Sequence, residues 1–543
     1  MKVRWHWLRQ WAQLSALVAA LVACGDDDDD VTPIDPPPAT GTAMVRVVHA
    51  SPNAPAVNVH PAGAGTAVIS DLAFGQASAY VSLGATEVQF DIRAATDDPS
   101  TTNPVFTTPP VTLAADKKYT VVAAGLLGST SADDNFRVLV YEEAFSAPPA
   151  AQAQVRVVHA SPDAPEVGID VNSDAVPDTT VARFADSGAA GISLPADQAL
   201  SLDIWATATS TQVTSFTATL PAGAEAFVIA LGQLGGHPRG TAVLAPTALP
   251  PDAAVRSNPG FALLAVGPQG SALEGGAIIK QDPVLYALHA AADVGNADIF
   301  ADTDGDNVTD TEVFDDLIFG ELSNDGQTAM MGGNTVNLGK PIQVSPGTYA
   351  LDVFPHVDGS TKPVDPPALN GSVELMAGER YLAIVSGAAT PETGQQALAF
   401  VVVKEELDLS DVTGHRLGFV HTATGVGAVD AGATDGTPGA FVGTPLFVNV
   451  AYAAQGDATG VTVPAVTPPV AINFGLGLTG GSPIAAFSLT PTIGLRGYVA
   501  AVGTNEGGDP NQLTAAVIGT PPFDAGMMDM SLMGMWTWAK ESL

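Results

Sequence analysis

The stretch Val45-Arg-Val-Val-His-Ala-Ser-Pro-Asn-Ala-Pro55 decides the fold, because the chain uses it repeatedly. The same letters return 110 positions later as Val155-Arg-Val-Val-His-Ala-Ser-Pro-Asp-Ala-Pro165, with one difference in eleven. Looser copies follow at Leu285-Tyr-Ala-Leu-His289 and Leu417-Gly-Phe-Val-His421. Side chains alternate between the two faces of a strand, and proline cannot continue a sheet ladder, so each copy predicts a strand that ends at a turn. We therefore expect one β-rich unit to occur four times.

Two further patterns recur in the same order downstream of each histidine strand. One is a central strand in which a polar residue stands between apolar neighbours, at Asp91, Asp203, Asp352 and Asn473. The other is an apolar strand that opens with an aromatic residue and ends in glycine, as in Tyr119-Thr-Val-Val-Ala-Ala-Gly125. Short alternating runs between turn residues are typical of β-sandwiches. The sequence predicts an all-β fold: a tandem array of about four antiparallel, Ig-like β-sandwich domains behind a signal peptide and a disordered tether.

The repeats divide the chain into segments. They are a lipoprotein signal peptide (1–23), an acidic, proline-rich tether (24–42), repeat 1 (43–147), repeat 2 (153–248), a linker or extra strands (249–280), repeat 3 (281–405), repeat 4 (412–520) and a tail rich in Met and Trp (521–543).

The first 24 residues predict export and a lipid anchor. A basic start is followed by a short apolar run, Leu14-Ser-Ala-Leu-Val-Ala-Ala-Leu-Val-Ala23, which is too short for a stable membrane span. The run ends in Leu21-Val-Ala-Cys24, which resembles a bacterial lipobox, and Cys24 is the only cysteine of the chain. Ordinary cleavage beside an incidental cysteine is the alternative. We expect Cys24 to be lipidated and to attach the protein to the cell envelope, at the outer membrane.

Composition excludes several classes of protein. The formal net charge is −37, and a nucleic-acid partner is excluded because phosphate binding needs a basic surface. A single cysteine excludes an internal disulfide framework and a cysteine-based zinc site. The sequence Gly475-Leu-Gly-Leu-Thr-Gly480 has dinucleotide-binding spacing, but further β-type sequence follows it where a helix would be needed. The tail from Met527 to Met535 could bind Cu(I), although a core or contact surface is the favoured interpretation.

The repeated Val-Arg-Val-Val-His-Ala-Ser-Pro-x-Ala-Pro, with Phe90-Asp-Ile92 or Leu202-Asp-Ile204 downstream, resembles the bacterial DUF4397 family, a domain of unknown function. The resemblance is close in repeats 1 and 2 and rests on the histidine and strand order in repeats 3 and 4. It implies a secreted or surface-anchored β-sandwich module, often in tandem and behind a lipobox. The family has no established catalytic residues, so none is transferred to this chain.

The recurring histidines are His49, His159, His289 and His421. A binding site in each unit is one interpretation, but each unit supplies one recurrent histidine, and the spacing matches no metal motif. The favoured interpretation is structural: the ring bonds the backbone of the following turn and fixes the end of the strand. The recurring Asp91, Asp203, Asp352 and Asn473 are expected on the strand face that points away from the core.

Two loops contain oxygen ligands at alternate positions, as calcium loops do. The stronger candidate has Asp302, Asp304, Asp306 and Asp310, with the carbonyl of Val308. The weaker one has Asp170, Asn172, Asp174 and Asp178. Neither has glycine at position 6, and Glu312 stands one place before position 12. We expect both loops to lie at the same place after the histidine strand. An acidic turn without an ion is the alternative.

The functional hypothesis is a non-catalytic, lipid-anchored envelope protein whose tandem domains bind, adhere or act as a scaffold. Its expected partners are the membrane, through Cys24, and an envelope protein or polysaccharide. No cofactor is expected with certainty, Ca²⁺ being the one candidate. The alternatives are a calcium-stabilised adhesion or matrix protein, and a surface hydrolase that acts on polymers through a residue such as His159 or Asp203.

Overall fold

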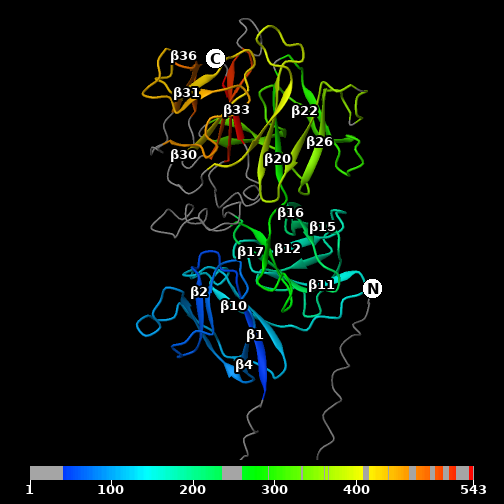
Figure 1. The fold of residues 1–543 in the computed structure, drawn as a ribbon, viewed down its shortest axis with the longest axis vertical. Coiled ribbons are helices and arrows are strands. Elements are labelled where there is room, and N and C mark those ends of the chain that lie inside the picture. Colours follow the sequence, from blue (N-terminus) through cyan, green and yellow to red (C-terminus); the bar gives the residue numbers. More distant parts are fainter. Residues whose placement is uncertain are drawn as a thin grey trace, which may run out of the picture. The chain divides into compact units, whose positions relative to one another are not determined.

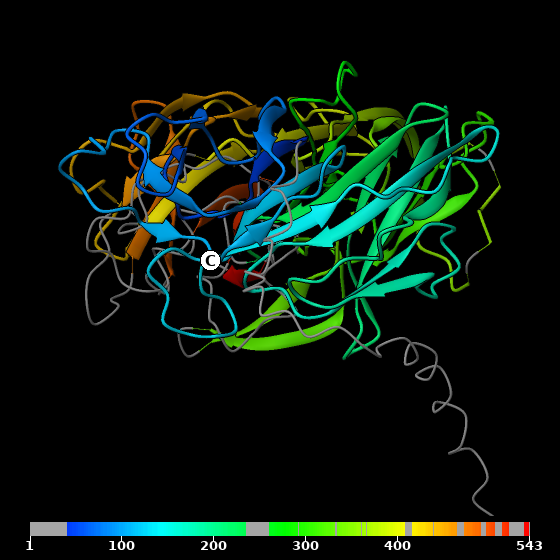
Figure 2. The ribbon, with the colours of Figure 1, turned by 90° about the horizontal axis from the view of Figure 1, so that it is seen from below.

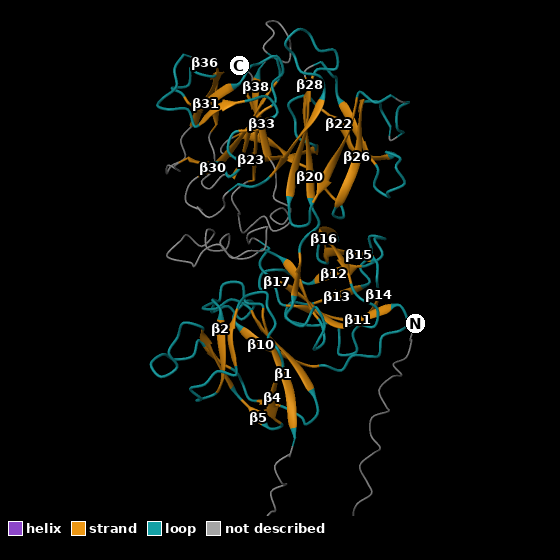
Figure 3. Ribbon diagram, viewed as in Figure 1, coloured by secondary structure: helices purple, strands orange, loops and turns teal. Residues whose placement is uncertain are grey.

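The computed structural model describes residues 41–234, 260–291, 293–331, 334–359, 361–364, 366–407, 415–437, 439–463, 472–489, 496–504, 513–520 and 537–541. The predicted signal peptide and Cys24, almost all of the tether, and Met527 to Met535 lie outside these residues. The described chain contains strands and loops and no helix (Figures 1 and 3). Accordingly, none of its described segments is a helix long and apolar enough to cross a membrane.

The strands form four sandwiches, and each has a sheet that contains a repeated histidine, called here the histidine sheet, and a second sheet. In sandwich 1 the histidine sheet has β10 (Arg137–Glu142), β9 (Lys118–Ala124), β1 (Thr42–His49) and β4 (Val81–Gly84), and the second sheet has β3 (Ile69–Leu72), β2 (Val57–Pro61), β6 (Phe90–Ala94) and β7 (Phe106–Thr107). A small separate sheet pairs β5 (Glu87–Val88) with β8 (Val111–Thr112).

Sandwich 2 has the same plan with a wider histidine sheet. That sheet has β14 (Ile192–Pro195), β11 (Gln152–His159), β17 (Glu225–Leu231), β18 (Ala262–Val266) and β19 (Ala277–Ile279). Its second sheet has β13 (Thr179–Val181), β12 (Val167–Asp170), β15 (Ala199–Ala206) and β16 (Thr211–Thr219). The segment predicted as a linker or extra strands thus supplies β18 and β19.

Sandwich 3 has a histidine sheet of β25 (Ile342–Gln343), β20 (Val284–Ala291), β28 (Arg380–Gly387) and β29 (Ala399–Lys404). Its second sheet has β22 (Thr311–Leu317), β21 (Ala297–Ala301), β26 (Gly347–Pro355) and β27 (Leu369–Leu375).

Sandwich 4 has the widest histidine sheet, because strands from outside repeat 4 join it. That sheet has β23 (Asn324–Met331), β24 (Asn334–Gly339), β39 (Thr537–Glu541), β38 (Thr514–Thr520), β37 (Arg496–Val502), β30 (His415–His421), β33 (Ala454–Gln455) and β34 (Val461–Val463). Its second sheet has β32 (Phe447–Val450), β31 (Val429–Ala433), β35 (Ile472–Leu478) and β36 (Pro483–Leu489). The β23–β24 hairpin of repeat 3 and β39 of the tail were not expected in this sheet.

The all-β sandwich prediction is confirmed, but the sheets are not antiparallel throughout. Each histidine strand runs parallel to the aromatic-led strand, and the partners of the four histidines are Ala123, Ala230, Val385 and Ala501. The other pairs of named strands are antiparallel, and the strands twist from one to the next (Figure 2). Alternation cannot distinguish the two directions, because both place side chains on opposite faces with period two.

Glycine ends the aromatic-led strand because the backbone there turns left-handed against a neighbouring chain. Gly125 has φ +81°, and a Cβ on it would lie 2.2 Å from the Asn135 carbonyl oxygen. Gly387 has φ +98°, with the Ala397 carbonyl oxygen at 2.3 Å from the same position. A side chain is excluded at both glycines by conformation and by space.

The histidine strands are buried on both faces. In β1, Val45 and Val47 pack into the core of sandwich 1, whereas Val48 packs with Val158 and Phe227 of sandwich 2. The core shared by sandwiches 1 and 2 consists of Val48, Ala50, Ala77, Val122, Ala124, Tyr141, Val158, Ala160, Phe227, Ile229, Leu231, Ala262, Leu264 and Val266. Two histidine sheets therefore pack face to face, and this explains why the repeated strand is apolar on both sides.

Sandwiches 3 and 4 share a core in the same way. In β20, Leu285 and Ala287 belong to the core of sandwich 3, whereas Tyr286 and Leu288 pack with Val420 and other residues of sandwich 4. Joint burial of apolar area is the main stabilising term in protein folding. The repeats are consequently joined as two pairs rather than strung as separate beads.

Buried charge marks the contact between sandwiches 1 and 2. The guanidinium of Arg46 bonds Glu143 at 3.2 Å and the carbonyl of Gly267. Arg46 and Arg156 each lie 5.7 Å from the ring of Phe227. A buried cation needs such partners to offset its lost hydration. The arginine of the repeated stretch thus belongs to the shared core.

Candidate functional site

The four repeated histidines have one geometry. Each imidazole is fully buried, and its Nε2 lies within hydrogen-bond distance of the carbonyl oxygen six residues further on. The distances are 2.9 Å to Pro55, 2.8 Å to Pro165, 2.7 Å to Gly295 and 2.9 Å to Gly427. A carbonyl oxygen can only accept, so Nε2 carries the proton and donates it. The ring holds the turn that follows its own strand.

The surroundings of these rings favour the neutral form. Burial lowers the pKa of all four histidines, and the pKa of His159 falls to about 4. An aromatic ring from the turn after the third strand packs edge-on against His49, His289 and His421, at 6.0 to 6.2 Å between centroids. With its Nε2 proton engaged and its ring fully buried, each imidazole is placed to stabilise the fold.

The recurring aspartates lie on the outer face of the second sheets and bond to local groups. Asp91 accepts from the Thr107 hydroxyl at 2.7 Å and from the Gly63 amide at 3.1 Å, and these bonds help lower its pKa although burial alone would raise it. Asp203 accepts from the hydroxyls of Ser173 and Ser201, both at 3.1 Å.

Asp352, the third of these aspartates, also accepts hydrogen bonds from nearby side chains. The fourth predicted residue, Asn473, is not at the equivalent position. Asp352 accepts from Lys362 at 3.0 Å and from the Thr309 hydroxyl. The expected equivalence of Asn473 was wrong. Asp298 of β21 and Asp430 of β31 are equivalent residues, and their strand partners are Phe354 in β26 and Gly477 in β35. Two residues before these partners stand Asp352 and Gly475. Gly475 therefore matches Asp352, and Asn473 lies two residues earlier.

The loop after β21 gathers the three leading aspartates of the stronger calcium candidate. Carboxylate oxygens of Asp302, Asp304 and Asp306 lie within 4.8 Å of one another. The carboxylate of Asp302 also accepts from the amides of Gly305 at 2.7 Å and Asn307 at 2.9 Å. Oxygens that converge in a tight loop suit a hard divalent cation.

The remaining residues of that candidate are placed differently. Asp310 is not part of the three-aspartate cluster, and its amide donates to the Val308 carbonyl at 3.1 Å, which engages the oxygen proposed as a ligand. Glu312 lies in β22, opposite Phe300, and not in the loop. Burial, together with the nearby carboxylates of Asp315 and Asp298, raises the pKa of Glu312.

The loop of sandwich 2 repeats the internal hydrogen bonds of the sandwich 3 loop and adds one from the Asn172 amide to Asp170. Asp170 accepts from the amides of Asn172, Ser173 and Ala175, and the side chains of Asn172 and Asp174 each accept from the amide two residues on. In addition, Asp178 accepts from the Val171 amide at 2.9 Å.

Both loops join the second strand of their sandwich to the third, β12 to β13 and β21 to β22, as expected. Their first aspartates are offset, because Asp170 is the last residue of β12 and faces Asp203, whereas Asp302 follows the end of β21. The equivalent of Asp170 in sandwich 3 is Phe300, which faces Asp352. The first aspartates therefore differ by two residues within a common loop, because one aspartate run begins inside its strand.

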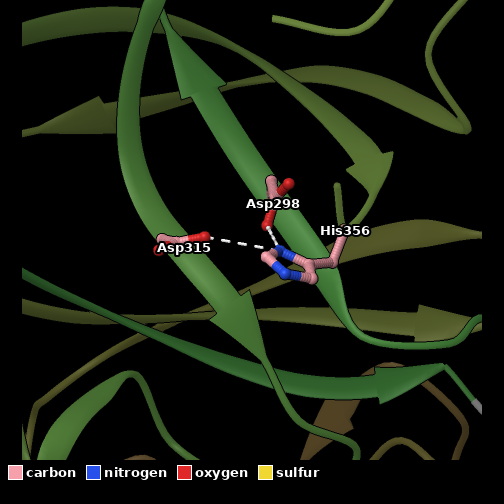
Figure 4. Close-up of side chains that lie close together, drawn as sticks. All are labelled: Asp298, Asp315 and His356. Carbon is pink, nitrogen blue, oxygen red and sulfur yellow. Dashed lines mark hydrogen bonds and ion pairs between the residues drawn. The ribbon is translucent and has the colours of Figure 1, made fainter. Parts of the chain in front are cut away.

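A second cluster, not found from the sequence, lies on the outer face of the second sheet of sandwich 3. Asp298 of β21, Asp315 of β22 and His356, which follows β26, converge there (Figure 4). His356 Nδ1 is 2.7 Å from Asp298 Oδ1 and 3.4 Å from Asp315 Oδ1. The hydrogen bond to Asp298 and the nearby carboxylates raise the pKa of His356. These residues are far apart in sequence, and no spacing rule connects them.

Comparison with known proteins adds a family for the first part of the chain. Residues 43–170 match the model of DUF4397, described as a domain of unknown function. The chain carries a DUF4397 domain. The match begins in β1, includes all of sandwich 1 and ends with β12, so the DUF4397 residues include the first two histidine strands.

Other comparisons add little to the DUF4397 match. No curated protein matches the chain. One similar solved structure is titled "The Bacillus anthracis TIE protein", with 9% sequence identity over 86% of this chain and 68% of that chain. Its TM-score is 0.14, which is too low to carry a structural argument.

Proposed function

We propose that this protein is a lipid-anchored component of the bacterial cell envelope that presents its sandwiches as a non-catalytic scaffold for binding or adhesion. The observation that carries the proposal is the pairing of sandwiches through shared cores. Two sheets that bury a common apolar face resist bending and separation, as an extended presenting element requires. The acidic, proline-rich segment after Cys24 supports a tether to the membrane.

The repeated polar residues fit this proposal better than they fit hydrolysis. His159 donates to Pro165 inside the fold, and Asp203 accepts from two serines. A hydrolase that used His159 would also have to bring substrate to a ring that is fully buried. If the chain were a hydrolase of this kind, His159→Ala or Asp203→Ala would abolish turnover of an envelope polymer while the fold remained.

Membrane fractionation tests the anchor. The wild-type protein should partition with the membrane and carry lipid, and Cys24→Ala should be released in soluble form. Equal partitioning of the two proteins would contradict a lipid anchor. The scaffold is tested by capture of envelope proteins and polysaccharides on the ectodomain, residues 25–543, with turnover of the captured polymer measured in parallel. Turnover would contradict a non-catalytic scaffold.

A calcium-stabilised scaffold is the second candidate, favoured by the convergence of Asp302, Asp304 and Asp306. Calorimetry of the ectodomain would then show Ca²⁺ binding and a raised melting temperature, both lost in Asp304→Asn. Asp457→Asn is the matched control, since this exposed aspartate also accepts a backbone hydrogen bond two residues on, at 2.9 Å from the Thr459 amide. Binding that both variants weaken equally would indicate attraction by general acidity.

A further inference from the structure

In sandwiches 3 and 4, one aspartate of the second strand accepts hydrogen bonds from two backbone amides, an arrangement called here the backbone clamp. Asp298 accepts from the amides of Asp316 at 3.0 Å and Val357 at 3.1 Å. Asp430 does the same in sandwich 4, from the amides of Asn449 at 2.7 Å and Gly480 at 2.9 Å. The clamp is therefore a property of the fold that needs no imidazole.

His356 occupies a loop position that also exists in sandwich 4. The amide of His356 donates to the Asn296 carbonyl at 2.7 Å, and the amide of Thr479 makes the same bond to Ala428 at 3.0 Å. Thr479 is thus the sandwich 4 equivalent of His356. The imidazole is an addition to sandwich 3 that the clamp does not explain.

Negative charge at this place exceeds what one imidazolium can balance. Asp315 and Asp298 approach Nδ1, and Asp316 and Asp358 lie 3.8 and 3.5 Å from Nε2. Glu312 is also close enough for Asp298 and Asp315 to raise its pKa. Its Oε1 is buried and accepts no hydrogen bond from the described residues. A buried acceptor without a partner is costly, and a cation would satisfy it.

From this arrangement we propose that Asp298, Asp315 and His356 bind a divalent transition-metal ion of the zinc type. Imidazole nitrogen with carboxylate oxygen is a donor set that Zn²⁺ accepts. Ligands about 2.1 Å from a tetrahedral ion lie roughly 3.4 Å apart, close to the separation of Nδ1 from Asp315. The 2.7 Å contact with Asp298 widens when the ion replaces the shared proton.

The sheet holds the two aspartates in place. β21 pairs with both β22 and β26, so the two aspartates are on adjacent strands and His356 follows directly from a third (Figure 4). Asp298 keeps its two amide bonds and retains lone pairs for an ion. Donors on paired strands keep their geometry better than donors on loops. The site differs in place and in chemistry from the aspartate loop at 302–310.

Zinc titration of the ectodomain at physiological salt tests the proposal. Wild-type protein should bind one Zn²⁺ tightly, and both His356→Gln and Asp315→Asn should weaken that binding at least about tenfold. Glutamine can still donate to Asp298, and Asp315 is largely exposed, so both variants should fold. Asp358→Asn is the matched control: it removes the same charge beside Nε2 but no donor at Nδ1.

Three outcomes would overturn the proposal. They are no stoichiometric binding, equal binding by wild type and His356→Gln, and equal weakening in Asp315→Asn and Asp358→Asn.

Discussion

Phe227 offers the sharpest test of the shared core, because it belongs to sandwich 2 but contacts sandwich 1. Its ring is fully buried, packs edge-on against Phe145 at 5.2 Å and lies 6.2 Å from Tyr141. Removing a buried phenylalanine side chain costs about 3–5 kcal/mol. Loss of contact with the guanidinium groups of Arg46 and Arg156 adds about 0.5–1 kcal/mol for each.

The assay is native-state hydrogen exchange in the ectodomain, followed in peptides from β9 and β10. In Phe227→Ala the opening of these strands should become easier by at least about 4 kcal/mol, which corresponds to roughly a thousandfold faster exchange. The control is Phe216→Ala, which removes an equally buried ring from the core of sandwich 2 itself. While sandwich 2 stays folded, that variant should leave β9 and β10 unchanged. Unchanged exchange of β9 and β10 in Phe227→Ala would refute the shared core.

The remaining predictions concern the repeated histidine and glycine. His159→Ala should destabilise the fold by about 2–3 kcal/mol in denaturant unfolding, since it leaves a cavity and an unpaired Pro165 carbonyl. The lowered pKa of His159, about 4, means that its contribution to stability is complete above about pH 6.5. Unfolding free energy should fall by up to about 3 kcal/mol as the pH drops from 6.5 toward 4, and His159→Ala should reduce this dependence. Gly125→Ala should cost more than 2 kcal/mol, whereas Gly128→Ala, with φ +82° and no neighbour within 4 Å, should cost only about 1 kcal/mol; equal losses would contradict the close approach to Asn135.

Much of the fold could be predicted because its signals are local and repeated. Alternation around Val45 and Val47 identified the strand, and recurrence of its histidine identified the four units. The other face of the strand also contains apolar residues, such as Val48, and these indicate that a second sheet covers it. A strand apolar on both faces is buried on both faces, but alternation alone does not say which sheet covers the second face.

The candidate sites were predicted only where their residues are neighbours in sequence. The loop from Asp302 was visible because one turn brings its first three aspartates together. Asp298, Asp315 and His356 could not be connected, since strand pairing alone makes them neighbours. Asn473 was misplaced because the equivalent position is Gly475, which has no side chain to mark it.

The face that joins sandwiches 1 and 2 has a consequence for how such chains can be divided. A single sandwich cut from its partner would expose a flat apolar sheet that includes Val48, Val122 and Tyr141, and exposed surfaces of this kind promote aggregation. The smallest soluble fragment is therefore expected to be a pair of neighbouring repeats. Gain or loss of repeats during evolution should accordingly proceed in twos, and recombinant fragments should be cut between the pairs and not within them.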